Sequence, residues 1–125
     1  MSFRILLVED NPRTRAQLVQ ALRTVNAEIT EAVDGLDGLS QAKQGQFDLV
    51  LLDHKMPVMD GLSLLRNLRE LVDYEDTPLL LMTTQEINQI EPQALKSGAN
   101  DCLAKPIADD ALAEAVKGFM MRDVA

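Results

Sequence analysis

The stretch Leu49-Val50-Leu51-Leu52-Asp53-His54-Lys55-Met56-Pro57 decides how this chain folds. Its first four residues form an aliphatic run that is too short to span a membrane and apolar enough for a strand buried on both faces. The run ends on the carboxylate of Asp53, and Pro57 and Asp60-Gly61 then supply turn residues. Open α/β sheets bind ligands at the carboxyl ends of their strands, so Asp53 lies where a functional group is expected. Taken alone, Asp53 is equally compatible with a cap for the following helix.

Strand and helix patterns alternate along the rest of the chain. Strand patterns cover residues 4–8, 28–32, 47–52, 79–82 and 101–104, and each is followed by apolar residues at helical spacing. The second strand is half polar, which favours a place at a sheet edge. Pro92 predicts either that the fourth helix starts near Glu91 or that it is kinked. Five βα units in a row predict a parallel sheet covered by helices on both faces.

Composition narrows the class of protein. A chain of 125 residues with 46% hydrophobic and 26% charged residues is typical of one globular domain. The formal charge of -8 argues against direct nucleic-acid binding. No apolar run reaches the length of a membrane span, no signal peptide is present, and the single cysteine, Cys102, fits a reducing compartment. We therefore expect a cytoplasmic protein that binds no membrane.

The strand ends share polar and charged residues. In a parallel sheet all carboxyl ends lie at one edge, which here gathers Glu9, Asp10, Asp53, Thr83 and Lys105. Three acids repel one another and one lysine cannot neutralise them, whereas a hard divalent cation such as magnesium would. We expect magnesium to raise the melting temperature. We also expect Asp10→Asn or Asp53→Asn to stabilise the metal-free protein.

These residues resemble a known family. Val8-Glu9-Asp10-Asn11, Leu52-Asp53 followed by Met56-Pro57 and Asp60-Gly61, Thr83-Thr84, and Lys105-Pro106 occur in the order and spacing of response-regulator receiver domains, the family typified by the chemotaxis regulator. The resemblance covers residues 1–125 as a single receiver domain. It implies an α/β fold of the flavodoxin-like type: a three-layer doubly wound (βα)5 sandwich whose five-stranded parallel sheet has the order 2-1-3-4-5.

The resemblance also implies the chemistry. Asp53 would accept a phosphoryl group from a histidine kinase or a histidine phosphotransfer protein, and the signal would pass through a conformational or partner-binding change. Glu9, Asp10, Asp53 and the main-chain carbonyl of Lys55 would hold Mg2+, with Mn2+ as a possible substitute. Thr83 and Lys105 would contact phosphoryl oxygens. The chain would then be a signalling phosphoacceptor with self-catalysed transfer and autodephosphorylation, not an enzyme acting on other substrates.

Three further residues carry specific expectations. The Lys105-Pro106 peptide bond is expected to be cis, in a sharp turn that aims Lys105 at the site. Cys102 occupies the position where many receivers carry an aromatic switch residue, so the usual partner of Thr83 is missing there. His54 is expected to be a solvated bystander, because strand alternation turns neighbouring side chains to opposite sides.

Other classes fit less well. A haloacid-dehalogenase-type phosphatase needs a second aspartate two residues after the nucleophile, where this chain has Lys55. A flavodoxin-like cofactor binder would not place Glu9-Asp10 beside a phosphate that lacked a metal. A receiver that is never phosphorylated usually lacks an acidic or lysine position, and none is lost here. The cognate kinase and the output stay open, as does the choice between a stand-alone regulator and part of a longer chain.

Overall fold

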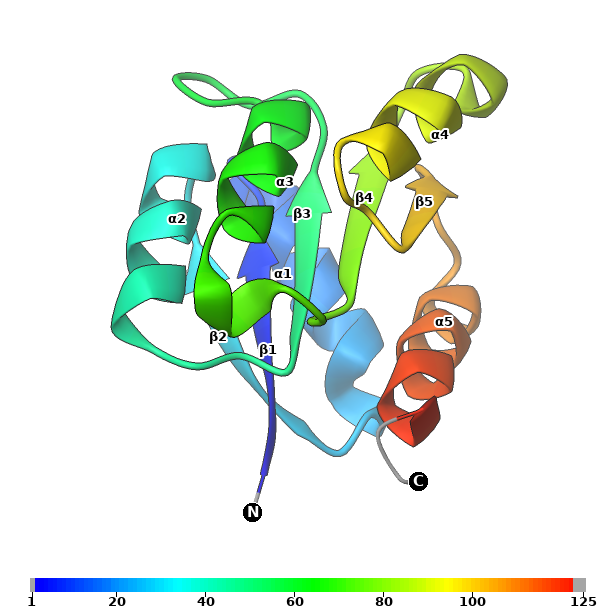
Figure 1. The fold of residues 1–125 in the computed structure, drawn as a ribbon. Helices are drawn as coiled ribbons and strands as arrows, with labels where there is room; N and C mark the ends of the chain where they lie inside the picture. Colours follow the sequence, from blue (N-terminus) through cyan, green and yellow to red (C-terminus); the bar gives the residue numbers. More distant parts are fainter. Residues whose placement is uncertain (1, 123–125) are drawn as a thin grey trace.

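A parallel five-stranded sheet forms the centre of the computed structural model, which describes residues 2–122 (Figure 1). The strand order is β2-β1-β3-β4-β5, so the predicted order and the edge position of the half-polar strand are confirmed. The most central strand, β3, is buried along its whole length, as its aliphatic sequence predicts. The strands are β1 (Phe3–Val8), β2 (Ala27–Ala32), β3 (Leu49–Asp53), β4 (Leu79–Thr83) and β5 (Asp101–Ala104).

Five α-helices connect and cover the strands, and several begin at capping side chains. Asn11 accepts a hydrogen bond from the Thr14 amide at 3.0 Å, and Asp60 accepts one from the Ser63 amide at 2.9 Å. Pro92 lies inside the fourth helix, so a start near Glu91 is wrong. The helices are α1 (Pro12–Ala21), α2 (Gly35–Gln44), α3 (Gly61–Arg69), α4 (Ile87–Lys96) and α5 (Asp109–Arg122), with short 3-10 helices at Leu22–Thr24 and Val72–Tyr74.

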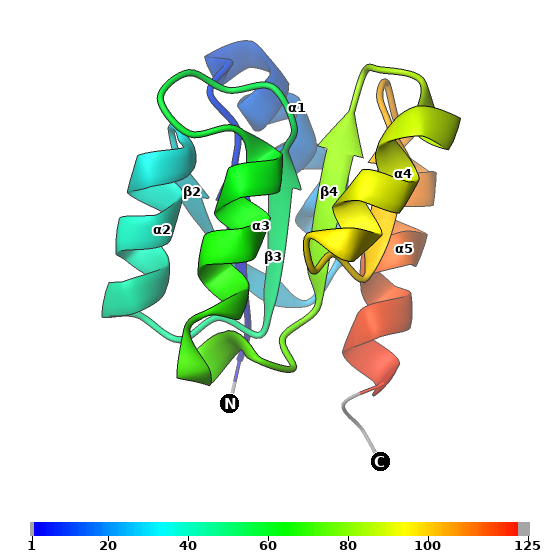
Figure 2. The ribbon, with the colours of Figure 1, turned by 45° about the horizontal axis from the view of Figure 1, so that its top comes forward.

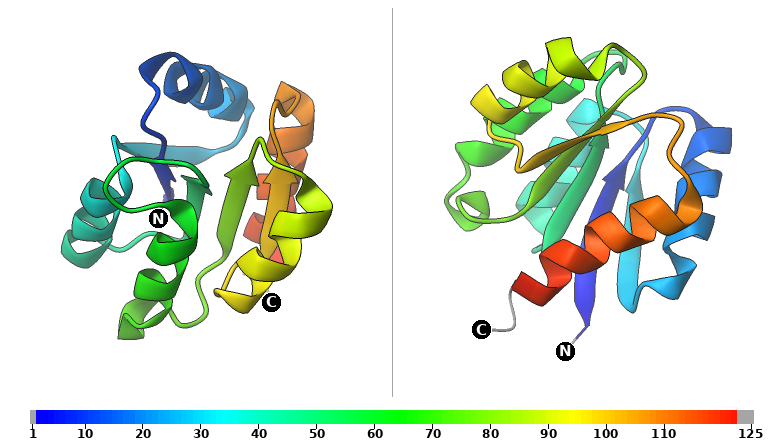
Figure 3. Two further views of the ribbon diagram at one scale, coloured as in Figure 1. Left: turned by 90° about the horizontal axis from the view of Figure 1, so that it is seen from above. Right: turned by 90° about the vertical axis from the view of Figure 1, so that its right-hand side faces the viewer.

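Strand alternation divides the core into two layers. Viewed from above in Figure 3, α1 and α5 cover one face of the sheet, and α2, α3 and α4 cover the other. Leu51 and Met82 pack in the α1–α5 layer, whereas Leu52, Leu81 and Cys102 pack in the α2–α4 layer. Burying each large aliphatic side chain contributes roughly 1.5–3 kcal/mol, so both layers are needed for stability.

The strand register brings the ends of β3, β4 and β5 to one edge. Asp53 is aligned with Met82, and Thr83 is aligned with Ala104. Figure 2 turns this edge toward the viewer and shows the loop between β3 and α3 curving over it. None of the helices within residues 2–122 is long and apolar enough to cross a membrane.

Candidate functional site

Three carboxylates meet at the carboxyl ends of β1 and β3. Glu9, Asp10 and Asp53 each offer an oxygen within 4.8 Å of the others. Glu9 and Asp53 are buried, with 1% and 7% of their surface exposed, and Asp10 is half-buried. An all-oxygen donor set of this size, open on the Asp10 side, fits a hard divalent cation that keeps some of its water.

Lys105 reaches into this cluster from the end of β5. Its Nζ donates hydrogen bonds to Glu9 Oε1 at 2.8 Å and to Asp53 Oδ1 at 3.0 Å. The Lys105-Pro106 peptide bond is cis, which is the geometry that the family resemblance implies. The Lys105 amide also donates to the Thr83 carbonyl at 2.7 Å, which anchors the turn on β4. The lysine therefore offsets part of the carboxylate charge by direct contact.

The electrostatic environment sets the charge of these groups. Burial raises the pKa of Glu9, although its hydrogen bond to Lys105 acts in the opposite direction. Burial alone would lower the pKa of Lys105, but the hydrogen bonds to Glu9 and Asp53 outweigh it and raise the pKa. Lys105 is thus a cation at neutral pH. Glu9, its hydrogen-bond partner, takes up a proton more easily than an exposed glutamate does.

Arg15 supports the site although the sequence gives no signal for it. Its Nη1 donates to the main-chain carbonyl of Glu9 at 2.8 Å, and its Nε pairs with Glu31 on β2 at 3.1 Å. The Asn11 amide donates to Glu9 Oε2 at 3.2 Å. These contacts fix the backbone of Glu9 and one of its carboxylate oxygens, while Lys105 contacts the other.

His54 is not the solvated bystander expected from the sequence. Only 2% of its surface is exposed, and its Nδ1 lies 2.9 Å from Thr83 Oγ1. The His54 amide continues the β3–β4 ladder by donating to the Met82 carbonyl at 2.8 Å. Alternation does turn the side chain away from Asp53, but the face to which it turns is covered by protein. Burial lowers the pKa of His54, with the charge of Lys55 acting in the same direction, so the ring is neutral at pH 7.

Thr83 and Cys102 share the face on which His54 lies. Thr83 is fully buried, and its Oγ1 accepts a hydrogen bond from the Gln85 amide at 3.0 Å. Cys102 is aligned with Leu81, which lies two residues before Thr83 on the same face of β4. The Cys102 side chain packs in the α2–α4 layer. Burial raises the pKa of the Cys102 thiol to about 11, so it stays protonated. By strand alternation, the side chains of Asp53, Glu9 and Lys105 belong to the other face of the sheet, the one that α1 and α5 cover.

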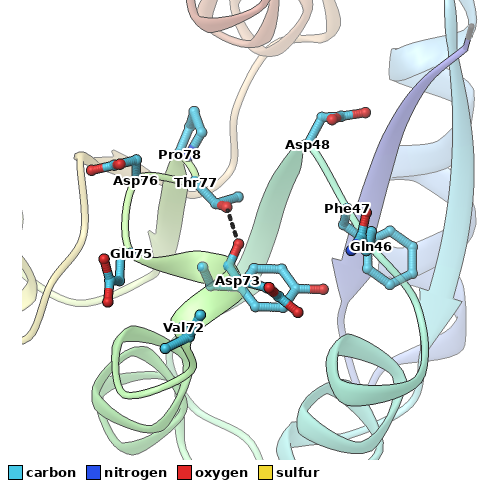
Figure 4. Close-up of a pocket in the computed structure, with 10 residues that line it drawn as sticks. Gln46, Phe47, Asp48, Val72, Asp73, Glu75, Asp76, Thr77 and Pro78 are labelled. Atoms are coloured by element: carbon cyan, nitrogen blue, oxygen red, sulfur yellow. Dashed lines mark hydrogen bonds between the residues drawn. The ribbon is translucent and has the colours of Figure 1, made fainter.

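An acidic pocket lies away from this cluster, at the amino ends of β3 and β4 (Figure 4). It brings together Asp48, Asp73, Glu75 and Asp76, and the Thr77 hydroxyl donates to the Asp73 carbonyl at 3.5 Å. It contains none of the residues that the sequence places at the functional edge. Parallel sheets bind ligands at the opposite end of their strands, so the carboxylate–lysine cluster is the candidate site.

Comparisons with known proteins agree with this geometry. The family model described as "Response regulator receiver domain" matches residues 5–117. The cyclic di-GMP phosphodiesterase response regulator RpfG of Xanthomonas campestris is 37% identical over 109 residues, which are 86% of this chain and 29% of that protein. Two further curated relatives are likewise longer, and the chain spans 33% of PfeR from Pseudomonas aeruginosa, at 41% identity, and 46% of HprR from Escherichia coli, at 37% identity.

Solved structures show the same fold. The chemotaxis response regulator CheY4 of Vibrio cholerae superposes with a TM-score of 0.89 at 27% identity, covering 95% of this chain and 99% of that one. The receiver domain of the sensor histidine kinase PA1611 from Pseudomonas aeruginosa, with magnesium coordinated in its active-site cleft, gives 0.86 at 29% identity, covering 97% and 99%. The chain belongs to the response regulator receiver domain family of two-component signalling systems.

Proposed function

We propose that Asp53 is the phosphoacceptor of this receiver domain. The observation that carries the proposal is the buried Asp53 carboxylate with Lys105 Nζ 3.0 Å from Oδ1 and with two further acids beside it. Phosphoryl transfer depends mainly on positioning and on neutralising charge at the transferred oxygens. A lysine and an oxygen-rich metal site at one carboxylate meet both needs.

The proposed reaction is a transfer from a histidine to the aspartate. An Asp53 oxygen attacks phosphorus, the phosphorus–nitrogen bond of the phosphohistidine breaks, and an acyl phosphate forms. Attack by water on that phosphorus later returns the carboxylate and inorganic phosphate, so the chain catalyses its own transfer and its own dephosphorylation. Lys105 exchanges a carboxylate partner for a phosphoryl oxygen, and Thr83 donates to another.

The metal site follows from the same cluster. We propose that Glu9, Asp10, Asp53 and the main-chain carbonyl of Lys55 hold Mg2+, with Mn2+ as a substitute. When bound, the cation would neutralise negative charge on the transferred phosphoryl group. Glu9 is kept in place by Asn11 and Arg15, so it is ready to bind without rearrangement of its backbone. The magnesium-bound receiver of PA1611 supports this assignment by its likeness.

The phosphodonor is proposed to be a histidine kinase or a histidine phosphotransfer protein. A groove of about 720 Å³ runs between α1 and the turn after Lys105, and it is lined by apolar and polar side chains that include Ala16, Leu18, Pro106 and Ile107. Lys105 itself borders this groove, so a helix seated there would bring its histidine close to the site. We further propose that residues 1–125 act as one receiver domain.

Acetyl phosphate, a small acyl phosphate, tests the proposal without a partner. With magnesium, intact-mass spectrometry should show one added phosphoryl group on the wild type and none on Asp53→Asn. Asp109→Asn, which changes an exposed aspartate at the start of α5, is the matched control and should be modified like the wild type. Modification of Asp53→Asn, or equal modification of the wild type in EDTA, would contradict the assignment.

A further inference from the structure

We propose that His54 is a positioning residue that holds the Thr83 hydroxyl in its unphosphorylated place and responds when Thr83 leaves it. The inference rests on the proposed function, because it concerns what happens when Asp53 carries a phosphoryl group. Its starting point is the buried contact between His54 Nδ1 and Thr83 Oγ1 at 2.9 Å.

Counting donors and acceptors assigns the direction of this hydrogen bond. Within residues 2–122, Thr83 Oγ1 has two partners, the Gln85 amide and His54 Nδ1. The amide can only donate, so the proton of this fully buried hydroxyl has one acceptor left, His54 Nδ1. A buried hydroxyl proton without an acceptor would be costly. His54 therefore accepts at Nδ1 and carries its own proton on Nε2.

This direction makes His54 a competitor of the phosphoryl group. Thr83 has one proton, and donating it to a phosphoryl oxygen requires breaking its bond to His54 Nδ1. Once that bond breaks, the imidazole nitrogen loses its donor inside the protein. The ring must then find another donor or turn, and we expect either change to alter the packing at the beginning of the loop between β3 and α3, to which His54 belongs.

The position of His54 explains how a receiver can work with a cysteine at position 102. Side chains 54, 83 and 102 occupy the same face of the sheet by strand alternation, and Cys102 lies one step below Thr83. Cys102 carries no aromatic ring that could rotate when Thr83 moves. An aromatic ring is nevertheless in contact with Thr83, and it is supplied by the end of β3 instead of by β5. We infer that the response to Thr83 is read through this ring and the β3–α3 loop.

The imidazole can be observed without ambiguity, because His54 is the single histidine of the chain. Two-bond proton–nitrogen NMR spectra of untagged protein give the tautomer directly. We expect the Nε2–H tautomer in the free protein and a clear change of the Nδ1 shift when beryllofluoride, a mimic of the phosphoryl group, is added with magnesium. An Nδ1–H tautomer in the free protein, or an unchanged Nδ1 shift with beryllofluoride bound, would overturn the inference.

Two variants separate the hydrogen bond from the ring. His54→Phe keeps a ring but removes the acceptor, so beryllofluoride should bind about two- to tenfold more tightly, which is the worth of one neutral hydrogen bond. His54→Asn offers an amide oxygen near the place of Nδ1 and should bind close to the wild-type value. Thermal melts of both variants would check that they fold. If His54→Phe does not fold, the NMR test on the wild type still decides the inference.

A double-mutant cycle completes the test. In a Thr83→Ala background, His54→Phe should no longer change the affinity for beryllofluoride, because the competing proton is gone. An equal gain with and without Thr83 would overturn the inference and assign His54 a purely packing role. A wild type that binds no beryllofluoride would overturn the proposed function and this inference together. Binding with no coupling between His54 and Thr83 overturns the inference alone.

Discussion

Removing the Lys105 ammonium should destabilise the metal-free protein. Lys105→Met keeps an unbranched stem of similar length but removes the ammonium. Glu9 and Asp53, whose side chains are 1% and 10% exposed, are then left without their cation. Breaking a buried ion pair by deleting one partner costs about 3–5 kcal/mol. Two effects reduce this cost: the variant no longer has to desolvate the lysine ammonium, and Glu9 can take up a proton. We therefore expect the free energy of unfolding to fall by about 2 kcal/mol at pH 8. For a domain of this size that lowers the melting temperature by roughly 8 °C.

The pH dependence identifies the cause. The pKa of Glu9 in the folded protein is raised from its ordinary value of 4.5, so the native state binds more protons than the unfolded state between that value and the folded pKa. Stability therefore rises as the pH falls through this window. Without Lys105 the folded pKa of Glu9 rises further, so the deficit of Lys105→Met should shrink from pH 8 toward pH 5.

Calorimetric melts of both proteins in EDTA at these two pH values measure the effect. Lys96→Met, which removes an exposed lysine in the last turn of α4, is the control and should stay within about 0.5 kcal/mol of the wild type. Magnesium should raise the midpoint of Lys105→Met more than that of the wild type, because the cation no longer competes with the ammonium. A deficit that is absent, or that stays constant with pH, would refute the assignment of Lys105 as the counter-charge of the cluster.

Three further substitutions test the acidic cluster and the support of Asp53. Asp10→Asn should stabilise the metal-free protein by about 1 kcal/mol, as urea denaturation would show, because Asp10 adds repulsion and makes no ion pair within residues 2–122. The sequence predicted the same gain for Asp53→Asn, but that change also gives up the Lys105 contact at 3.0 Å, so we now expect little or no gain. Gly61→Ala should cost about 1–3 kcal/mol and slow modification by acetyl phosphate, since its Cβ would overlap the Asp53 carbonyl and approach Leu81 Cδ1 to 2.6 Å. Unchanged stability and modification in that variant would show that the loop adapts freely.

Strand-end chemistry made much of the site predictable. The aliphatic run before Asp53 and the polar residues at the carboxyl ends of β1, β4 and β5 placed Glu9, Thr83 and Lys105 at one edge because parallel strands share their direction. The contact of His54 with Thr83 could not be found this way. It depends on the register of β3 against β4, which aligns Asp53 with Met82 and leaves His54 beside Thr83.

The role of Arg15 and the start of α4 were missed for different reasons. Arg15 contacts a main-chain carbonyl, and a side chain that binds backbone leaves no pattern in the sequence. Pro92 argued for a late helix start on local propensity. The packing of Ile90 and Ala94 in the α2–α4 layer, on either side of the proline, holds one continuous helix instead.

The alternation of the strands has a consequence for how such a protein diversifies. The carboxylates and Lys105 belong to one alternation set, and Thr83, His54 and Cys102 belong to the other, which packs under α2, α3 and α4. Substitutions in the second set can alter what the outer helices present without touching the residues of the first set. Selection on the carboxylate–lysine cluster and selection on the helices above the second set therefore act largely on separate groups of side chains. The two groups are joined by the backbone that carries Asp53 and His54 in succession and by Thr83, which contacts His54 and is proposed to donate to the phosphoryl group.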